Sequence, residues 1–260
     1  MARNPLRTKL QANETTTGLW VTIECASIAE IAVALQLDWI TIDMEHGHLG
    51  FKEVMAHIRA VRNTNTAALV RVPAVEADYV KRVLDMGAHG VILPLLDSRA
   101  DVERAFSFGR YPPEGMRGVG GERAFKWGMG FHDYVKIANE ETLLIPLIET
   151  RAATEAIDDI LAVPGLEAIF FGPADLSATN GYLGEWEGPG LAQQILDMKD
   201  KAKARGIASG IMAQDLENSQ LRRDQGFDMV ALGTDATLLV RAVRENLRAL
   251  GRDIEPKLWF

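Results

Sequence analysis

Cysteine is almost absent from this chain of 260 residues. The single cysteine, Cys25, excludes an intramolecular disulfide and is typical of a protein from a reducing compartment. No apolar run approaches the length of a membrane span, and residues 1–10 lack the apolar core of a signal peptide. We therefore expect a cytoplasmic protein with no membrane partner.

Positive charge is also scarce. The chain has 28 lysines and arginines against 36 acids, for a net charge of −8, and no basic stripe runs along it. A nucleic-acid partner is therefore not expected. An anionic substrate would have to be attracted by a few local cations. The remaining composition, 47% hydrophobic and 25% charged, is that of an ordinary globular protein.

A glycine-rich phosphate loop is missing as well. The first strand pattern ends in Ile23-Glu-Cys-Ala-Ser27, which argues against a doubly wound dinucleotide-binding sheet, the second-ranked fold. Short apolar runs alternate with amphipathic helical stretches such as 27–37, 51–62, 77–86 and 191–205, as in a parallel sheet buried on both faces. The length and the alternation predict one α/β domain over residues 1–260, a (β/α)8 TIM barrel. Its strands are expected at 18–23, 39–43, 68–72, 91–95, 143–148, 168–172, 207–211 and 229–233.

Three segments mark the boundaries of this pattern. Gly87, Gly206 and Gly226 precede the fourth, seventh and eighth strands, where they would end the preceding helices. Residues 110–121 are rich in proline and glycine and begin an excursion of about thirty residues, and such long connections are often functional. Residues 254–260 carry aromatic bulk, so we expect this tail to dock onto a neighbouring subunit.

No lysine falls at a predicted strand end, where a barrel enzyme keeps its chemistry. A Schiff-base mechanism needs such a lysine in an apolar site, so carbanion stabilisation here would have to come from a metal ion.

Two acids follow neighbouring predicted strands. Glu149 and Asp175 are one strand–helix unit apart, and adjacent strands are about 4.8 Å apart, so the two carboxylates should repel unless a cation or a proton lies between them. Two protein oxygens, with water and substrate completing the shell, are typical of Mg²⁺ and similar ions. The structural alternative is that Glu149 pairs with Arg151 and that Asp175 caps a short helix at 176–177.

Arg71 and His46 are the other polar candidates at strand ends. An arginine within a barrel strand is costly to desolvate, which favours a role in holding a carboxylate or a keto oxygen over a purely structural pairing with a rim acid. His46 is interpreted as a general acid or base supported by the nearby Asp43 and Glu45. The pair His46 and His48 resembles a zinc-hydrolase motif, but such sites need further histidines at strand ends.

With these residues in place, the chain resembles the HpcH/HpaI family of class II pyruvate aldolases, which have barrels of the phosphoenolpyruvate/pyruvate type. The resemblance covers nearly the whole chain, and the motifs that carry it occur in family order. They are Gly18-Leu-Trp20, Ile42-Asp-Met-Glu-His-Gly47, Arg71-Val-Pro73, Leu84-Asp-Met-Gly87, Arg110-Tyr-Pro-Pro113, Ile148-Glu-Thr150 and Gly172-Pro-Ala-Asp-Leu-Ser177.

The resemblance implies a role for each site residue. Glu149 and Asp175 match the ligands of a divalent Mg²⁺, Mn²⁺ or Co²⁺ ion, and His46 matches an acid/base group that acts with a metal-bound water. Asp43 would support His46, together with Asp85 of a neighbouring subunit. The family assembles as hexamers, trimers of dimers with exchanged C-terminal helices. The implied substrate-binding set is Trp20, Arg71 on the keto oxygen, Leu147, Gly172, and the backbone N–H groups of Ala174 and Asp175.

One position departs from the family pattern. Close relatives often have glutamine two residues before the metal-binding glutamate, and this chain has Leu147. The expected function is metal-dependent cleavage or formation of the C3–C4 bond of a 4-hydroxy-2-keto acid, which gives pyruvate or a close analogue and an aldehyde. The alternatives are a CoA-thioester lyase related to citrate lyase β or malyl-CoA lyase, which should need a basic nucleotide surface, and a non-catalytic keto-acid-binding barrel.

Overall fold

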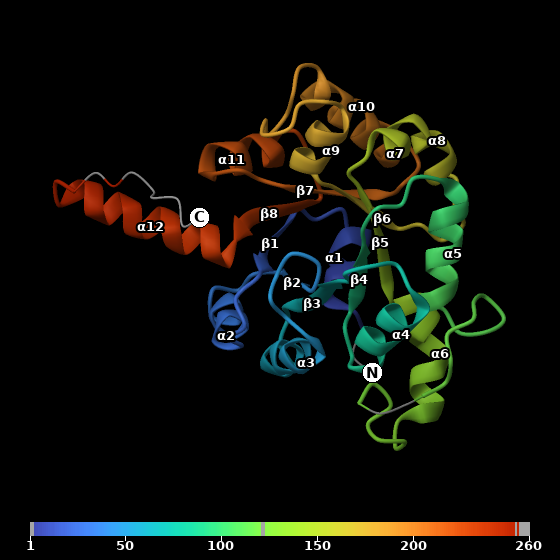
Figure 1. Ribbon diagram of the computed structural model, residues 1–260. Coiled ribbons are helices and arrows are strands. Elements are labelled where there is room, and N and C mark those ends of the chain that lie inside the picture. The colour runs from blue at the N-terminus through green and yellow to red at the C-terminus, as the bar shows by residue number, and fades with distance from the viewer. Residues whose placement is uncertain (1–2, 121–122, 253, 255–260) are drawn as a thin grey trace.

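The computed structural model describes residues 3–120, 123–252 and 254 (Figure 1). Its strands form a closed parallel barrel in the order β1 to β8, so the predicted TIM barrel is confirmed. The strands are β1 Thr16–Val21, β2 Trp39–Asp43, β3 Ala67–Arg71, β4 Gly90–Leu93, β5 Leu143–Ile148, β6 Ala168–Phe171, β7 Ala208–Met212 and β8 Met229–Thr234.

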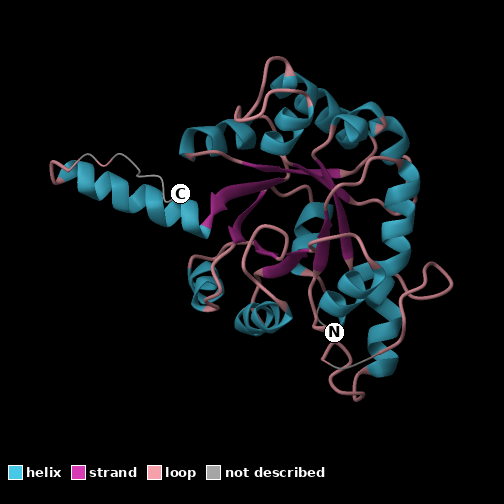
Figure 2. Ribbon diagram, viewed as in Figure 1, coloured by secondary structure: helices cyan, strands magenta, loops and turns pink. Residues whose placement is uncertain are grey.

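Helices surround this barrel (Figure 2). The four amphipathic stretches that the sequence singled out are all helical, and each helix ends one to three residues before the predicted limit. None of the helices in the described residues is long and apolar enough to cross a bilayer. The helices are α1 Pro5–Gln11, α2 Ser27–Ala34, α3 Phe51–Ala60, α4 Ala77–Asp85, α5 Arg99–Gly109, α6 Phe131–Glu141, α7 Arg151–Glu155, α8 Ile157–Ile160, α9 Pro173–Thr179, α10 Leu191–Ala204, α11 Leu216–Asp224 and α12 Asp235–Ala249.

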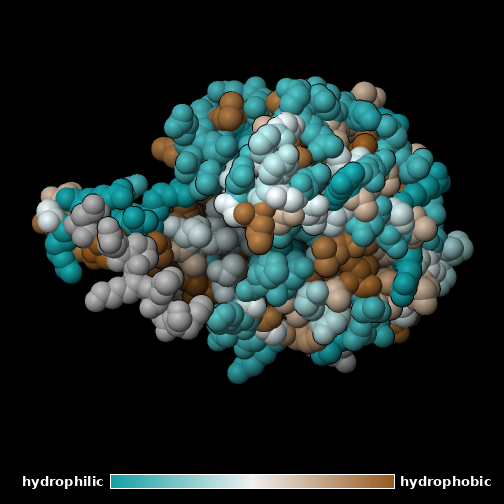
Figure 3. Space-filling view, turned by 45° about the horizontal axis from the view of Figure 1, so that its top comes forward, coloured by the Kyte–Doolittle hydropathy of each residue, from teal (hydrophilic) through white to brown (hydrophobic). Residues whose placement is uncertain are grey.

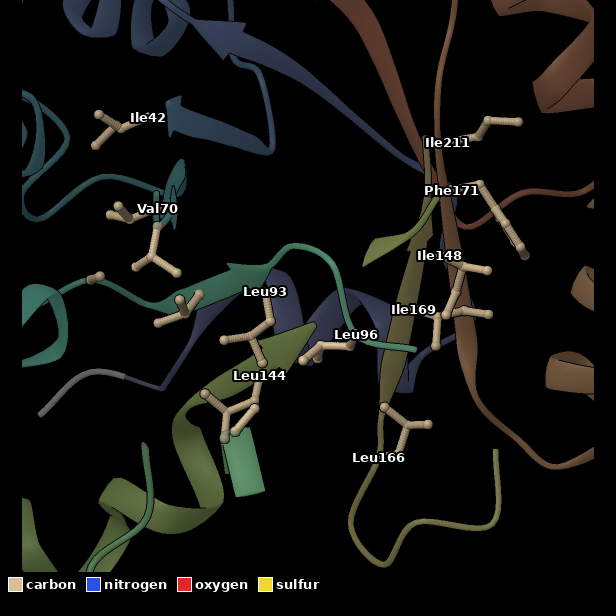
Figure 4. Close-up of a cluster of buried hydrophobic side chains, with 14 of the residues drawn as sticks. Ile42, Val70, Leu93, Leu96, Leu144, Ile148, Leu166, Ile169, Phe171 and Ile211 are labelled. Atoms are coloured by element: carbon tan, nitrogen blue, oxygen red, sulfur yellow. The ribbon is translucent and has the colours of Figure 1, made fainter. Parts of the chain in front are cut away.

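Alternation along the strands divides the core into two layers, because successive side chains of a strand point to opposite faces. On β3, Ala68 and Val70 face the helices, whereas Ala67 and Leu69 fill the barrel interior. Figure 4 shows the outer layer, with side chains of several strands turned away from the barrel axis. Both strand faces are therefore buried, which explains the continuous apolar runs in the sequence.

Two glycines make room for aromatic rings inside the barrel. A Cβ atom on Gly18 would lie 2.1 Å from the Trp39 ring, and one on Gly210 would lie 2.2 Å from the Phe170 ring. The two rings pack edge to face, with centroids 6.0 Å apart. Larger residues at either glycine would displace the aromatic filling of the barrel.

The helix ends agree with the sequence prediction, whereas the long connection and the end of the fourth strand differ from it in detail. Gly87, Gly206 and Gly226 all have positive φ, as expected of glycines that end helices. The excursion after residue 110 ends in helix α6. Leu95, predicted as the end of the fourth strand, instead lies beyond β4 in a left-handed conformation and is 65% exposed.

Helix α1 closes the amino-terminal end of the barrel. Leu6 is fully buried in the interior layer, and the Asn4 side chain donates to the carbonyl oxygens of His89 and Glu141, which precede β4 and β5. Arg7 bonds Glu167 before β6 at 2.8 Å, and Lys9 bonds Asp38 before β2. These contacts fix α1 across the strand starts.

Helix α12 leaves the barrel as an arm (Figure 1). Asp235, its first residue, is its only buried residue, whereas Leu239, Val240 and Val243 are 60%, 57% and 47% exposed. Figure 3 shows hydrophobic residues along this arm. Apart from residues 252 and 254, the polypeptide beyond Gly251 lies outside the described residues, and with it residues 255–260 of the predicted docking tail.

Candidate active site

A cavity of about 490 Å³ lies at the carboxyl ends of the strands. Strand alternation explains its walls, because residues two positions beyond an interior-facing residue also face inward. Trp20 and Thr22 continue the interior face of β1, Leu147 and Glu149 that of β5, and Phe170 and Gly172 that of β6. Barrel enzymes have their active sites at this end, so the cavity is the candidate active site.

Nearly all of the predicted site residues line this cavity. One of them, Asp85, does not. The residues brought together are Trp20, Asp43, His46, Arg71, Leu147, Glu149, Gly172, Ala174 and Asp175.

Arg71 is held by acids of the neighbouring strand. Its Nε and Nη2 donate to the two carboxylate oxygens of Asp43 at 2.9 and 2.5 Å, and its Nη1 lies 3.0 Å from Glu45 Oε2. The guanidinium also lies 5.3 Å from the centre of the Trp20 ring. Since Arg71 is only 8% exposed, these partners offset the cost of burying its charge.

The predicted support of His46 by Asp43 takes a different form. The Asp43 carboxylate binds Arg71 and accepts the backbone N–H groups of Glu45 and His46 at 3.0 and 3.3 Å, and no bond joins it to the described His46 ring. It thus supports His46 by fixing the loop that carries it. The His46 side chain is exposed at the cavity mouth.

Glu149 is a buried acid, with only 3% of its surface exposed. One oxygen accepts the backbone N–H of Leu95 at 2.9 Å. Burial raises the pKa of Glu149 to about 7; the bond from Leu95 opposes this rise, and the charges of Glu45 and Asp175 add to it. Burial also raises the pKa of Glu45, against the effect of Arg71.

The structural alternative for the acid pair is wrong on both counts. Arg151 pairs with Glu155 at 2.8 Å and not with Glu149. Asp175 lies in the first turn of α9, where Gly172 is the capping residue and no side-chain cap is formed. Neither a salt bridge with Arg151 nor a helix-capping role therefore accounts for the two acids.

Four carboxylates and one guanidinium thus share the cavity region. Asp43, Glu45, Glu149 and Asp175 together carry more negative charge than Arg71 offsets, and a divalent cation at Glu149 and Asp175 would reduce their repulsion. In the described part of the chain, no three Asp, Glu, His or Cys side chains form a ligand cluster. A metal ion here would therefore need water or substrate oxygens to complete its shell, and the residues fit such a site.

The start of α9 presents backbone donors to the cavity. Pro173 is the first helical residue and has no N–H, so the donors of this first turn begin with Ala174 and Asp175, both exposed. Such groups have no acceptor within the helix and can bind a carboxylate.

Asp85 lies elsewhere, at the end of α4. It lines a separate cavity with Arg82 and Arg123, and its Oδ1 accepts Arg117 Nη2 at 2.7 Å. Within one chain it is not part of the site. Its contribution to a neighbouring subunit stays a prediction.

Several lining residues were not singled out in the sequence. Met212 and Gln214 follow the interior face of β7, so strand alternation could have indicated them. Thr237 lies in the first turn of α12. Trp186 lies in the connection 180–190 between α9 and α10, where no periodic pattern gives a side-chain direction.

Comparisons with known proteins point to one family. The family described as HpcH/HpaI aldolase/citrate lyase matches residues 16–242. A hydroxypyruvate/pyruvate aldolase of Paraburkholderia phytofirmans is 35% identical over 252 residues, which cover 94% of this chain and 96% of that protein. A 4-hydroxy-2-oxovalerate aldolase of Novosphingobium aromaticivorans is 35% identical over 246 residues, 94% of each chain.

A solved structure extends the likeness to three dimensions. A HpcH/HpaI aldolase/citrate lyase family protein from Burkholderia cenocepacia J2315 superposes with a TM-score of 0.91 at 33% identity and covers 96% of this chain and all of that one. Sequence match and fold thus agree over nearly the full length. The chain belongs to the HpcH/HpaI aldolase/citrate lyase family.

Proposed function

We propose that this protein is a carbon–carbon lyase, a class II aldolase that cleaves or forms the C3–C4 bond of 4-hydroxy-2-keto acids. The products of cleavage would be pyruvate, or a close analogue such as hydroxypyruvate, and an aldehyde. The observation that carries the proposal is the excess of carboxylates around Arg71, with the buried Glu149 among them, at the carboxyl end of the barrel.

The cavity offers a separate partner for each part of a keto acid. The N–H groups of Ala174 and Asp175 can donate to its carboxylate, and Arg71 can donate to its keto oxygen. Glu149 and Asp175 would hold Mg²⁺, Mn²⁺ or Co²⁺, which as a Lewis acid stabilises enolate charge. Because Arg71 is buried and fixed by Asp43 and Glu45, its donors are oriented before the substrate binds.

Proton transfer is assigned to His46. Cleavage requires that a base take the proton of the C4 hydroxyl, and His46 is the histidine that lines the described cavity. Its exposed ring at the mouth can exchange that proton with solvent, directly or through a water.

The two alternative functions receive less support. Arg71 is the only lysine or arginine among the described residues that line the cavity, so the cavity walls do not offer the basic surface that a nucleotide of a CoA thioester should need. A barrel that only binds keto acids would use Arg71 but has no need of a histidine at the mouth.

The proposal is tested by measuring pyruvate release from a panel of 4-hydroxy-2-keto acids, with and without EDTA. We expect activity that EDTA abolishes and that Mg²⁺, Mn²⁺ or Co²⁺ restores. The matched variant Glu149→Gln keeps the volume of the side chain but removes its charge, and should lose Mn²⁺ binding in calorimetry. Activity that survives EDTA, or a lysine adduct trapped by borohydride with pyruvate, would contradict the metal mechanism.

A further inference from the structure

The carboxylate of Asp235 is buried between the end of β1 and the start of α12. The residue is only 6% exposed. Its Oδ1 accepts the backbone N–H of Thr22 at 3.0 Å, the Thr22 hydroxyl at 2.7 Å and the backbone N–H of Ala236 at 2.8 Å. Its Oδ2 accepts the backbone N–H of Ile23 at 3.0 Å. Four donors therefore compensate the burial of this charge, and three of them belong to the end of β1.

The two segments that Asp235 joins form one wall of the candidate active site. Thr22 lines the cavity from β1, and Gly233, Thr234 and Thr237 line it on either side of Asp235 in the sequence. Within the helix start, the backbone N–H of Thr237 donates to Thr234 Oγ1 at 3.0 Å. Asp235 can therefore act on the cavity through residues that it holds or adjoins.

A second hydrogen bond ties the arm α12 to the same cavity. Asp235 is the only buried residue of this helix. Two turns further on, Arg241 Nη2 donates at 2.8 Å to the carbonyl oxygen of Gln214, which also lines the cavity. Both of these attachments end on residues of the cavity wall. The orientation of the arm and the shape of the wall are therefore set together.

We propose that Asp235 is a positioning residue of the active site, whose carboxylate holds the Thr22 side of the cavity against the start of α12 in the geometry that binds the substrate. This inference rests on the proposed aldolase function and adds a residue to it. The hydrogen bonds of Asp235 go to Thr22, Ile23 and Ala236, and not to Arg71 or the acid pair. Its loss should therefore weaken substrate binding more than the bond-breaking step.

The test compares Asp235→Asn with Asp235→Ala. The amide keeps an oxygen for Thr22 and Ala236 but turns an NH₂ group toward the N–H of Ile23, whereas alanine loses all four bonds. With Mg²⁺ present, KM for a 4-hydroxy-2-keto acid should rise about tenfold in Asp235→Asn and further in Asp235→Ala, while kcat stays within a few-fold. The Kd of pyruvate, measured by calorimetry with Mg²⁺, should rise in the same order.

Asp228 offers a matched control at the opposite end of the barrel. Its Oδ2 accepts the backbone N–H of Ser209 on β7 at 2.7 Å and the Ser209 hydroxyl at 3.2 Å, the same pair of donors that Thr22 gives to Asp235. It precedes β8 and does not line the cavity. Asp228→Asn and Asp228→Ala should lower the urea midpoint and leave KM and Kd unchanged.

The outcomes separate three conclusions. Unchanged KM and Kd in both Asp235 variants, with an active wild-type protein, would overturn the role of Asp235 alone. An equal rise in the Asp228 variants would show that lost stability, and not the cavity wall, is responsible, and would overturn it too. If Asp235→Ala folds poorly, Asp235→Asn gives the same comparison. A wild-type protein that neither binds pyruvate nor releases it would instead overturn the proposed function, and this inference with it.

Discussion

Arg71 both neutralises acids and faces the cavity. A guanidinium has five N–H donors. Three of its contacts go to Asp43 and Glu45, through Nε, Nη1 and Nη2, so further N–H groups can reach a substrate oxygen. The same side chain therefore stabilises the fold and, in the proposed reaction, the enolate.

Arg71→Ala should therefore reduce both stability and activity. Asp43 is 1% exposed, and removal of one partner of a buried ion pair costs about 3–5 kcal/mol. Loss of a donor to the enolate should also raise KM and lower kcat by about 10²–10³. Urea unfolding and steady-state kinetics measure the two effects.

A second substitution separates these effects. In Arg71→Ala/Asp43→Asn, the neutral amide can still accept the N–H groups of Glu45 and His46, so much of the lost stability should return while activity stays low. If the double variant is no more stable than the single one, the ion pair with Asp43 is not what Arg71 stabilises.

Residue placement was predictable where strand alternation applies. Leu147 and Glu149 are two positions apart on β5, and Arg71 follows Leu69 on β3, so alternation accounts for the inward direction of all three side chains. How Asp43 supports His46 could not be judged from the sequence. It depends on the register in which Asp43 lies opposite Arg71, and this pairing takes up the carboxylate.

At the scale of elements, the junction of β3 and β4 contains a histidine that must stay neutral. His89 Nδ1 accepts the backbone N–H of Ala68 at 3.0 Å, which protonation of that atom would prevent. Burial lowers the pKa of His89 to about 4, with Arg123 adding to the effect. In an unfolded chain the pKa would be near 6.5.

Stability should therefore fall in acid. Above pH 6.5 the histidine is neutral in both states, and between pH 6.5 and 4 the unfolded state binds the proton more readily. The loss across that window is at most about 3.4 kcal/mol, at 1.36 kcal/mol per pKa unit. Urea unfolding between pH 4.5 and 7.5 measures it.

His89→Asn provides the comparison for this prediction. Its Oδ1 can accept the same N–H but does not titrate, so the dependence on pH should flatten. His132→Asn, at an exposed position of α6, should behave like the wild type. Equal slopes for all three proteins would show that His89 is not the group responsible.

The elements themselves were largely predictable. Continuous apolar runs and the positive-φ glycines Gly87, Gly206 and Gly226 place the strands and helix ends to within a few residues. Helix α1 was not predicted, because its role as a closure depends on contacts with residues far along the chain, such as Glu141 and Glu167.

At the scale of the whole molecule, the exposed apolar face of α12 has no partner within the described part of a single chain. An arm with Leu239, Val240 and Val243 exposed resembles a helix that packs on another subunit. Asp85 likewise lies outside the cavity of its own chain. We propose a homo-oligomer, a hexamer as in the family, in which α12 joins subunits and Asp85 approaches a neighbour's site.

Charges on the apolar face of α12 should separate the subunits. Leu239→Asp/Val243→Asp is expected to lower the molar mass in light scattering and to reduce activity, whereas Leu216→Asp, 78% exposed on α11, should change neither. A wild-type protein that is already monomeric and fully active would contradict the proposal.

The closure of the barrel by α1 bears on the order in which substrates bind and products leave. With the strand starts sealed by α1, the cavity lies at the carboxyl ends of the strands and opens there. In the proposed reaction the keto-acid half of the substrate would be held by residues at those strand ends, and the aldehyde half would lie nearer the opening. The aldehyde should then depart first and pyruvate last, and in synthesis pyruvate should enter first. Such an ordered sequence makes pyruvate a competitive product inhibitor of cleavage and the aldehyde a noncompetitive one, a pattern that initial-rate measurements distinguish.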